Sequence, residues 1–124
     1  MGGVSDSVEN DLLDHVLSTS AWTIPAGCYV SVHDGDPGET GANEISSTTR
    51  QGDTAFDAAA SGHTSNTSDI TYTSMPACTV SHVGIWDQAS AGTFLAGGIV
   101  APARSVGASS TFIFAAGDLD VTMD

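Results

Sequence analysis

The feature that most restricts the fold is a rapid succession of short strand-like runs in the second half of the chain. These runs are rich in β-branched and aromatic residues and cover residues 70–74, 78–86, 93–100, 111–115 and 118–123. Turn-forming residues separate them at positions 75–76, 89–92, 101–102 and 116–117. Strands at this spacing are typical of an antiparallel β-sandwich, and the sequence therefore predicts a mainly β, jelly-roll-like sandwich.

One amphipathic helix is predicted ahead of the strands. Apolar residues recur at three- and four-residue intervals over about residues 7–18, and acidic residues lie between them. Asp6 is the expected N-cap, because Glu9 follows it three residues later. We expect this helix to cover an end or an edge of the sandwich.

The region between the helix and the later strands is predicted to hold one strand and two loops. Residues 28–33 alternate in polarity, which indicates a half-buried strand with Val30 and Val32 on one face and Ser31 and His33 on the other. Residues 34–44 contain three glycines, one proline and four carboxylates, so we expect an exposed loop with a mobile tip. Small polar residues dominate positions 60–68 and predict a second loop.

The chain is expected to form one domain over residues 1–124, since a chain of this length can bury a single core. The predicted core consists of the apolar residues on the inward faces of the helix and strands. They are Leu12, Val16, Val30, Val32, Phe56, Ile70, Tyr72, Val80, Val83, Ile85, Phe94, Leu95, Ile99, Phe112, Phe114, Leu119 and Val121.

The charge balance is extreme. Fifteen acidic side chains face only Arg50 and Arg104, there is no lysine, and the net charge is -13. Nucleic acid and anionic lipid surfaces are excluded as partners, because binding to either requires basic side chains. The carboxylates are spread from Asp6 to Asp124, which predicts a uniformly hydrated surface rather than an acidic interaction arm. Such a surface suits molar salt, where screening is strong, and indicates a halophilic source; the alternative is an ordinary acidic protein at moderate salt.

No apolar run approaches the length of a membrane span, and the N-terminal region is acidic where a signal peptide would be basic. We therefore expect that the protein does not insert into a membrane. We expect it to assemble in the cytoplasm of the host cell. Cys28 and Cys78 have neither CxxC spacing nor nearby histidines, so buried thiols are expected rather than a zinc site. A Cys28–Cys78 disulfide is the alternative.

No pattern typical of an enzyme is present. There is no GxSxG, and His15, His33, His63 and His82 fall in different predicted elements. A glycine arrangement for phosphate binding is also absent, so no cofactor is expected. Asp34, Asp36 and Glu39 are the best candidates for a Ca²⁺ or Mg²⁺ site, because oxygen ligands two or three residues apart can wrap a hard cation. In a chain this acidic, coincidence is the leading explanation for that spacing.

Five segments, in order along the chain, resemble a known family. They are residues 9–17 (ENDLLDHVL), 29–37 (YVSVHDGDP), 81–87 (SHVGIWD), 91–92 (AG) and 114–119 (FAAGDL). Together they are similar to small tail-fibre or virion structural proteins of tailed phages, in which ENxLLDHLL precedes VGLHTxDP, followed by THVGLWDAxxGG and a closing FxAGxL. The chain departs from that pattern between residues 45 and 68, where an aromatic-Ala-Arg-Gln run is reduced to Thr49-Arg50-Gln51.

The resemblance implies a β-sandwich virion protein without enzymatic activity. With the acidic composition, it predicts a structural subunit of a tailed virus of a halophilic, archaeal host. The subunit is expected to form a symmetric homo-oligomer, on the capsid as decoration or turret or on the tail as fibre, and to contact other virion proteins. The expected contact surfaces are residues 34–44, residues 60–68 and the helix face with Asp11 and Asp14. The alternative function is a module that binds a host cell-surface glycan or another receptor.

Overall fold

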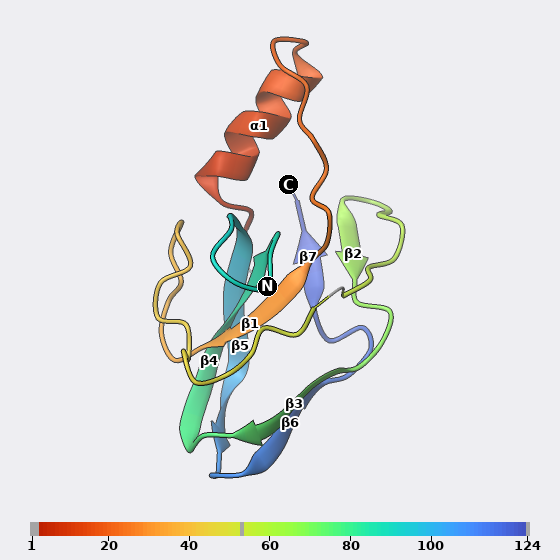
Figure 1. Ribbon diagram of the computed structural model, residues 1–124. Coiled ribbons are helices and arrows are strands. Elements are labelled where there is room, and N and C mark those ends of the chain that lie inside the picture. Colours follow the sequence, from red (N-terminus) through yellow and green to blue (C-terminus); the bar gives the residue numbers. More distant parts are fainter. Residues whose placement is uncertain (1–2, 53, 124) are drawn as a thin grey trace.

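The computed structural model describes residues 3–52 and 54–123, which form one helix and seven strands (Figure 1). The elements are α1 (Asp6–Val16), β1 (Tyr29–His33), β2 (His63–Ser65), β3 (Ile70–Met75), β4 (Cys78–Trp86), β5 (Phe94–Val106), β6 (Ser110–Phe114) and β7 (Asp120–Thr122). All strand pairs are antiparallel. The prediction of a mainly β, sandwich-like fold with one N-terminal helix is confirmed.

The main core lies between two sheets. One has the strand order β1-β4-β5, and the other pairs β3 with β6; β2 and β7 form a third, smaller sheet beside them (Figure 1). The side chains that meet in this core are Val30, Val32, Ile45, Ile70, Tyr72, Met75, Val80, Val83, Phe112, Phe114 and Leu119. Burial raises the pKa of the Tyr72 hydroxyl, which stays protonated and donates a 2.6 Å hydrogen bond to the Val30 carbonyl oxygen. This bond ties the two sheets together across the core.

The prediction that β1 is half-buried is wrong, because both of its faces are covered. Val30 and Val32 face the main core, whereas Ser31 and His33 are fully buried on the opposite side. The segment after β1 folds back along the outer edge of this strand, where Gln51 exchanges two backbone hydrogen bonds with Val30 and Ile45 donates one to Val32. On the polar face, the Ala42 carbonyl oxygen lies 2.7 Å from the His33 ring and Gly41 lies against Trp86. The part of residues 34–51 that covers this face forms a third layer over the β1-β4-β5 sheet.

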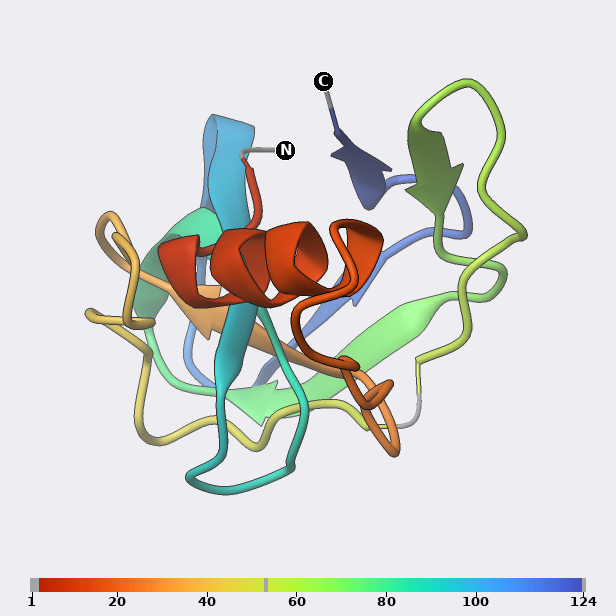
Figure 2. The same ribbon diagram turned by 90° about the horizontal axis from the view of Figure 1, so that it is seen from above.

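The helix is shorter than predicted, and it is capped by a different residue. Ser5, not Asp6, is the N-cap, and its hydroxyl oxygen accepts a hydrogen bond from the Val8 amide. Val8 is the only buried residue of α1, and Val16, predicted to be in the core, is 73% exposed. The reason is that α1 lies over one end of the β body and meets it only through its first turn (Figure 2). Over the described residues, no helix is long and apolar enough to cross a membrane.

Two further differences concern loops and strand ends. Residues 60–68, predicted as a loop, contain β2 and the buried Asn66, whose amide bonds to the backbone at Ser68, Ala115 and Leu119. The turn predicted at positions 101–102 lies inside β5, which continues to Val106 and includes a cis Ala101-Pro102 bond. Proline is tolerated there because β5 is the outer strand of its sheet, where a missing N–H interrupts no ladder.

The remaining core predictions are only partly confirmed. Ile85 and Phe94 are buried, although outside the main core, and Leu12, Phe56, Leu95 and Val121 are half-buried. Ile99, predicted to be buried, is 64% exposed on β5. Cys28 and Cys78 are half-buried and are not joined by a disulfide.

Candidate functional site

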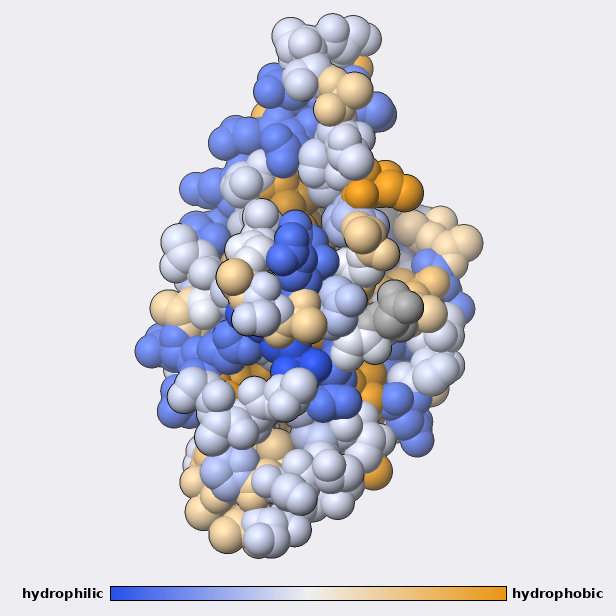
Figure 3. Space-filling model, viewed as in Figure 1, coloured by the Kyte–Doolittle hydropathy of each residue, from blue (hydrophilic) through white to orange (hydrophobic). Residues whose placement is uncertain are grey.

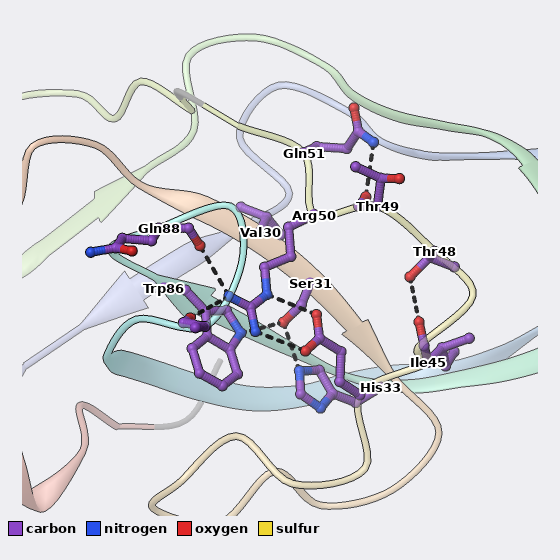
Figure 4. Close-up of polar contacts among 12 residues, drawn as sticks. Val30, Ser31, His33, Ile45, Thr48, Thr49, Arg50, Gln51, Trp86 and Gln88 are labelled. Atoms are coloured by element: carbon purple, nitrogen blue, oxygen red, sulfur yellow. Dashed lines mark hydrogen bonds and ion pairs between the residues drawn. The ribbon is translucent and has the colours of Figure 1, made fainter.

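Arg50 is the centre of a dense group of polar contacts in the third layer (Figure 4). Its guanidinium donates two hydrogen bonds to the Glu44 carboxylate, at 2.8 and 2.9 Å, in a bidentate pair. It donates two more to the carbonyl oxygens of Gln88 and Ala91, at 3.0 and 2.8 Å. The guanidinium carbon lies 3.6 Å from the centroid of the Trp86 ring. Arg50 thus fastens the folded-back segment to the turn between β4 and β5.

Beneath Arg50, a chain of hydrogen bonds leads from Trp86 to the loop after β1. The Trp86 indole N–H donates to the Ser31 hydroxyl at 2.9 Å, and Ser31 lies 2.7 Å from His33 Nε2. His33 Nδ1 lies 2.7 Å from the Ala42 carbonyl oxygen, which can only accept, so Nδ1 carries the proton. Burial lowers the pKa of His33, which favours the neutral ring. Nε2 therefore accepts a hydrogen bond from the Ser31 hydroxyl, and every polar group in this series of hydrogen bonds has a partner.

A serine hydroxyl beside a histidine is also half of a nucleophile-and-base arrangement. Here neither side chain has any solvent exposure. The Ser31 oxygen already accepts a hydrogen bond from Trp86 while its proton points to His33. No substrate atom can approach this hydroxyl in the folded chain, so the pair acts as a structural support.

Two glycines allow the backbone to lie against this network. A β-carbon on Gly84 would lie 2.7 Å from His33 Nε2 and 2.8 Å from the Ser31 hydroxyl oxygen. A β-carbon on Gly41 would lie 2.2 Å from the Trp86 ring, and Gly41 also has a positive φ of 79°. The loop predicted to be mobile is therefore packed closely onto Trp86 at Gly41.

We expect Gly41→Ala to lower the free energy of unfolding by about 2–4 kcal/mol, because it adds a clash with a fixed ring to left-handed strain. Gly38→Ala is the matched control. Gly38 also has a positive φ, of 58°, but a β-carbon there would meet nothing within 4 Å. Its expected cost is about 1 kcal/mol. Urea unfolding of both variants measures the difference, and equal losses would mean that Trp86 does not hold the loop.

The predicted cation ligands do not form one cluster. Asp36 Oδ1 accepts a hydrogen bond from the Gly38 amide, and Glu39 Oε2 accepts one from the Asp6 amide at the start of α1. In residues 3–52 and 54–123, no three His, Cys, Asp or Glu side chains are placed to hold a metal ion. A site formed by Asp34, Asp36 and Glu39 gains no support from this arrangement, and Glu39 instead caps the helix.

The other three histidines lie in separate places. His63 pairs with Asp120 and links β2 to β7, His82 contacts the Ser81 hydroxyl, and His15 accepts a hydrogen bond from the Trp22 amide. Of the three, His82 lines an open cavity that Glu9, Asp36 and Glu39 also line.

Glycan-binding sites usually present tryptophan or tyrosine rings at the surface, and two of the four such residues in this chain are not available there. Tyr72 is 1% exposed and Trp86 is 8% exposed, and the latter is covered by Arg50. Trp22 and Tyr29 are half-buried. The structure therefore leaves fewer aromatic platforms than the sequence offered for the alternative function.

The expected contact surfaces are only partly exposed. Asp11 and Asp14 lie on the open side of α1, and Asp34, Asp36 and Glu39 are exposed, whereas Pro37 is buried. The carboxylates are not evenly distributed over the strands. β3, β4, β5 and β6 contain no carboxylate at all, because between Ile70 and Gly117 the only acidic residue is Asp87. In Figure 3 the lower end of the molecule, over β3 and β6, is accordingly pale rather than blue.

Two of the segments that carry the family resemblance, residues 29–37 and 81–87, meet at the Arg50 network. Residues 29–33 pair in register with residues 82–86, from Tyr29 opposite Trp86 to His33 opposite His82. A family model for the podophage GP4 fiber I protein gp80 matches residues 3–122. The chain belongs to this family of phage fibre proteins. No curated protein matches the sequence.

Membership of the gp80 fibre family gives the chain a structural role in the virion, as a tail-fibre protein. The family pattern can now be read in physical terms. The two longest strand motifs of the pattern correspond to β1 and β4, which pair with each other. Above this pair, Arg50 donates a hydrogen bond to the Ala91 carbonyl oxygen and so holds the third layer in place. Sequence reasoning missed Glu44 and the structural use of Arg50. The available signal was that Arg50 is one of only two cationic residues in a chain without lysine.

Proposed function

We propose that this protein is a non-enzymatic, repeated subunit of a tail fibre, and that it assembles as a symmetric homo-oligomer. The observation that carries the proposal is the fibre-family match over residues 3–122. It favours the tail over the capsid positions, decoration or turret, that the sequence left open. The burial of the Ser31–His33 pair adds support, because this hydroxyl and its neighbouring ring have no solvent exposure.

The charge distribution indicates where copies could meet. We define the carboxylate-free end as β3, β6 and residues 99–106 of β5. If two copies meet there, these strands bring no acidic side chains into the contact. Contact through α1 or residues 34–44 would instead place several carboxylates of one copy close to those of the other. This end also exposes Ile113, at 43%. Ile99, 64% exposed, lies at its border, where it lines a cavity with Glu9, Asp36 and Glu39. Contact between copies through this end is therefore the arrangement with the least repulsion.

Light scattering coupled to size-exclusion chromatography tests the assembly. In NaCl raised from ~0.1 M to ~1 M, the screening length falls from about 10 Å to about 3 Å, so the mass should rise to a fixed multiple of the monomer. Ala103→Glu adds a carboxylate to the exposed surface of the carboxylate-free end and should lower the oligomer population. Ala59→Glu, on an exposed residue outside that end, is the matched control. A monomer at every salt concentration would contradict the proposal.

The net charge of -13 also supports a salt-rich setting for the virus, such as a halophilic archaeal host. The physical reason is self-repulsion of the folded chain, which salt relieves. The family match does not bear on the host.

A further inference from the structure

The C-terminal half of α1 projects beyond the contacts that fix the helix. Ser5 donates one backbone hydrogen bond to the Leu95 carbonyl oxygen and one from its hydroxyl to the Phe94 carbonyl oxygen, at 2.8 and 2.9 Å. The Asp6 amide donates to Glu39 at 2.7 Å. After Val8, no residue of α1 is buried. The helix is thus anchored at its start and free of the β body at its end, which forms the narrow top of the molecule (Figure 3).

This projection is a defined structure that exposes large apolar side chains. After α1, the amides of Thr19 and Ser20 and the Thr19 hydroxyl all donate to the Asp14 carbonyl oxygen, and the Trp22 amide donates to His15. The chain is therefore folded back onto the last turn of the helix. The exposed apolar residues of the projection are Leu13, Val16, Leu17 and Ile24, at 58%, 73%, 70% and 79%.

These side chains lack the packing that normally stabilises such a helix. An isolated helix of fewer than about 12–15 residues is marginal in water, and most helices in proteins depend on burial of their apolar face. At the end of α1, Leu13, Val16 and the C-cap Leu17 occupy one face at helical spacing and contact solvent. We call Leu13, Val16 and Leu17 the apical face.

The charges around the apical face indicate what can cover it. Asp6, Glu9, Asp11 and Asp14 lie on the same helix, and none of them takes part in the ion pairs found within the described chain. The chain's two arginines are not free to reach this face from a second copy in the proposed assembly. Arg50 is held by Glu44, and Arg104 lies on β5 at the carboxylate-free end, which the proposed contact between copies occupies.

We propose that the apical face binds a different protein of the virion, in an apolar groove bordered by lysine or arginine side chains. This inference rests on the proposed function, because it places the chain in a particle. A second copy is disfavoured at this position, since it would add four more carboxylates to the same contact. The apical face and the carboxylate-free end then serve two different contacts, one with another protein and one with copies of this chain.

Photo-crosslinking in assembled particles tests the partner. Leu17→p-benzoylphenylalanine and Ala103→p-benzoylphenylalanine are introduced separately into the full chain, and cross-linked peptides of purified particles are sequenced. We expect position 17 to link to a different virion protein, at a segment that contains lysine or arginine, and position 103 to link to a second copy. A link from position 17 to a second copy, or none while position 103 links, would overturn the inference and leave the proposed function standing. Absence of the chain from the particles would overturn both.

A pair of substitutions gives a second readout. Leu13→Ser with Leu17→Ser removes apolar contact area from exposed positions and should reduce incorporation into particles by about tenfold or more. Circular dichroism and the mass of the isolated oligomer should stay unchanged, because neither residue is buried. Incorporation equal to that of the unaltered chain would show that the apical face has no partner in the particle.

Discussion

Replacing Arg50 by alanine is expected to lower the free energy of unfolding by about 3–5 kcal/mol. The substitution leaves the Glu44 carboxylate without its bidentate partner in a site where the Arg50 side chain is only 8% exposed. It also removes the donor for the Gln88 and Ala91 carbonyl oxygens and uncovers the Trp86 ring. Urea unfolding at neutral pH, monitored by the fluorescence of the tryptophans, measures the loss.

Arg104→Ala is the matched control, because it removes the chain's other arginine. Arg104 is exposed, makes one hydrogen bond of 3.2 Å to the Ile113 carbonyl oxygen, and lies 5.3 Å from the Phe112 ring centroid. Its loss should cost about 0.5 kcal/mol or less. Arg50→Lys tests geometry rather than charge, since lysine cannot form the bidentate pair, and should fall between the two. Equal losses for the two alanine variants would show that Arg50 acts only through net charge.

Most of the β structure could be predicted because the residues within each strand and in the turns that flank it identify the strand. Residues 70–72 and 110–114 alternate between buried and exposed positions, and residues 78–86 are rich in β-branched and aromatic residues. Turn signals flank these strands, and the predicted bounds agree with them to within a residue or two. The position of α1 could not be predicted in this way. Its spacing shows that Leu13, Val16 and Leu17 share a face, but spacing does not tell whether that face meets the same chain or another one.

The polar third layer could not be predicted from the local sequence pattern, for a related physical reason. Ser31 and His33 alternate with Val30 and Val32, which is the pattern of a strand with one solvated face. Their burial depends on Arg50, Gly41 and Trp86, and these residues reach the site from different parts of the chain. The family motifs indicated which segments belong together, because residues 29–37 and 81–87 contain the two strands that the network joins.

Phe112→Ala is the second change expected to have a large effect, at about 3–5 kcal/mol of unfolding free energy. Phe112 is 5% exposed on β6, and its ring lies 4.9 Å from Phe114 and 6.2 Å from Tyr72, centroid to centroid. Removing it leaves a cavity between the two sheets that these fixed rings cannot fill.

The adjacent residue provides a control on the same strand. Ile113 points away from the core and is 43% exposed, so Ile113→Ala should cost about 1 kcal/mol or less. Chemical unfolding of both variants at ~1 M NaCl, where charge repulsion is screened, isolates the packing contribution. A larger loss for Ile113→Ala would mean that the inner face of β6 is the one that carries Ile113. The unfolding free energy of Ile113→Ala could instead fall only at protein concentrations where the oligomer forms. That result would place the Ile113 side chain in the contact between copies, because stability is then linked to assembly.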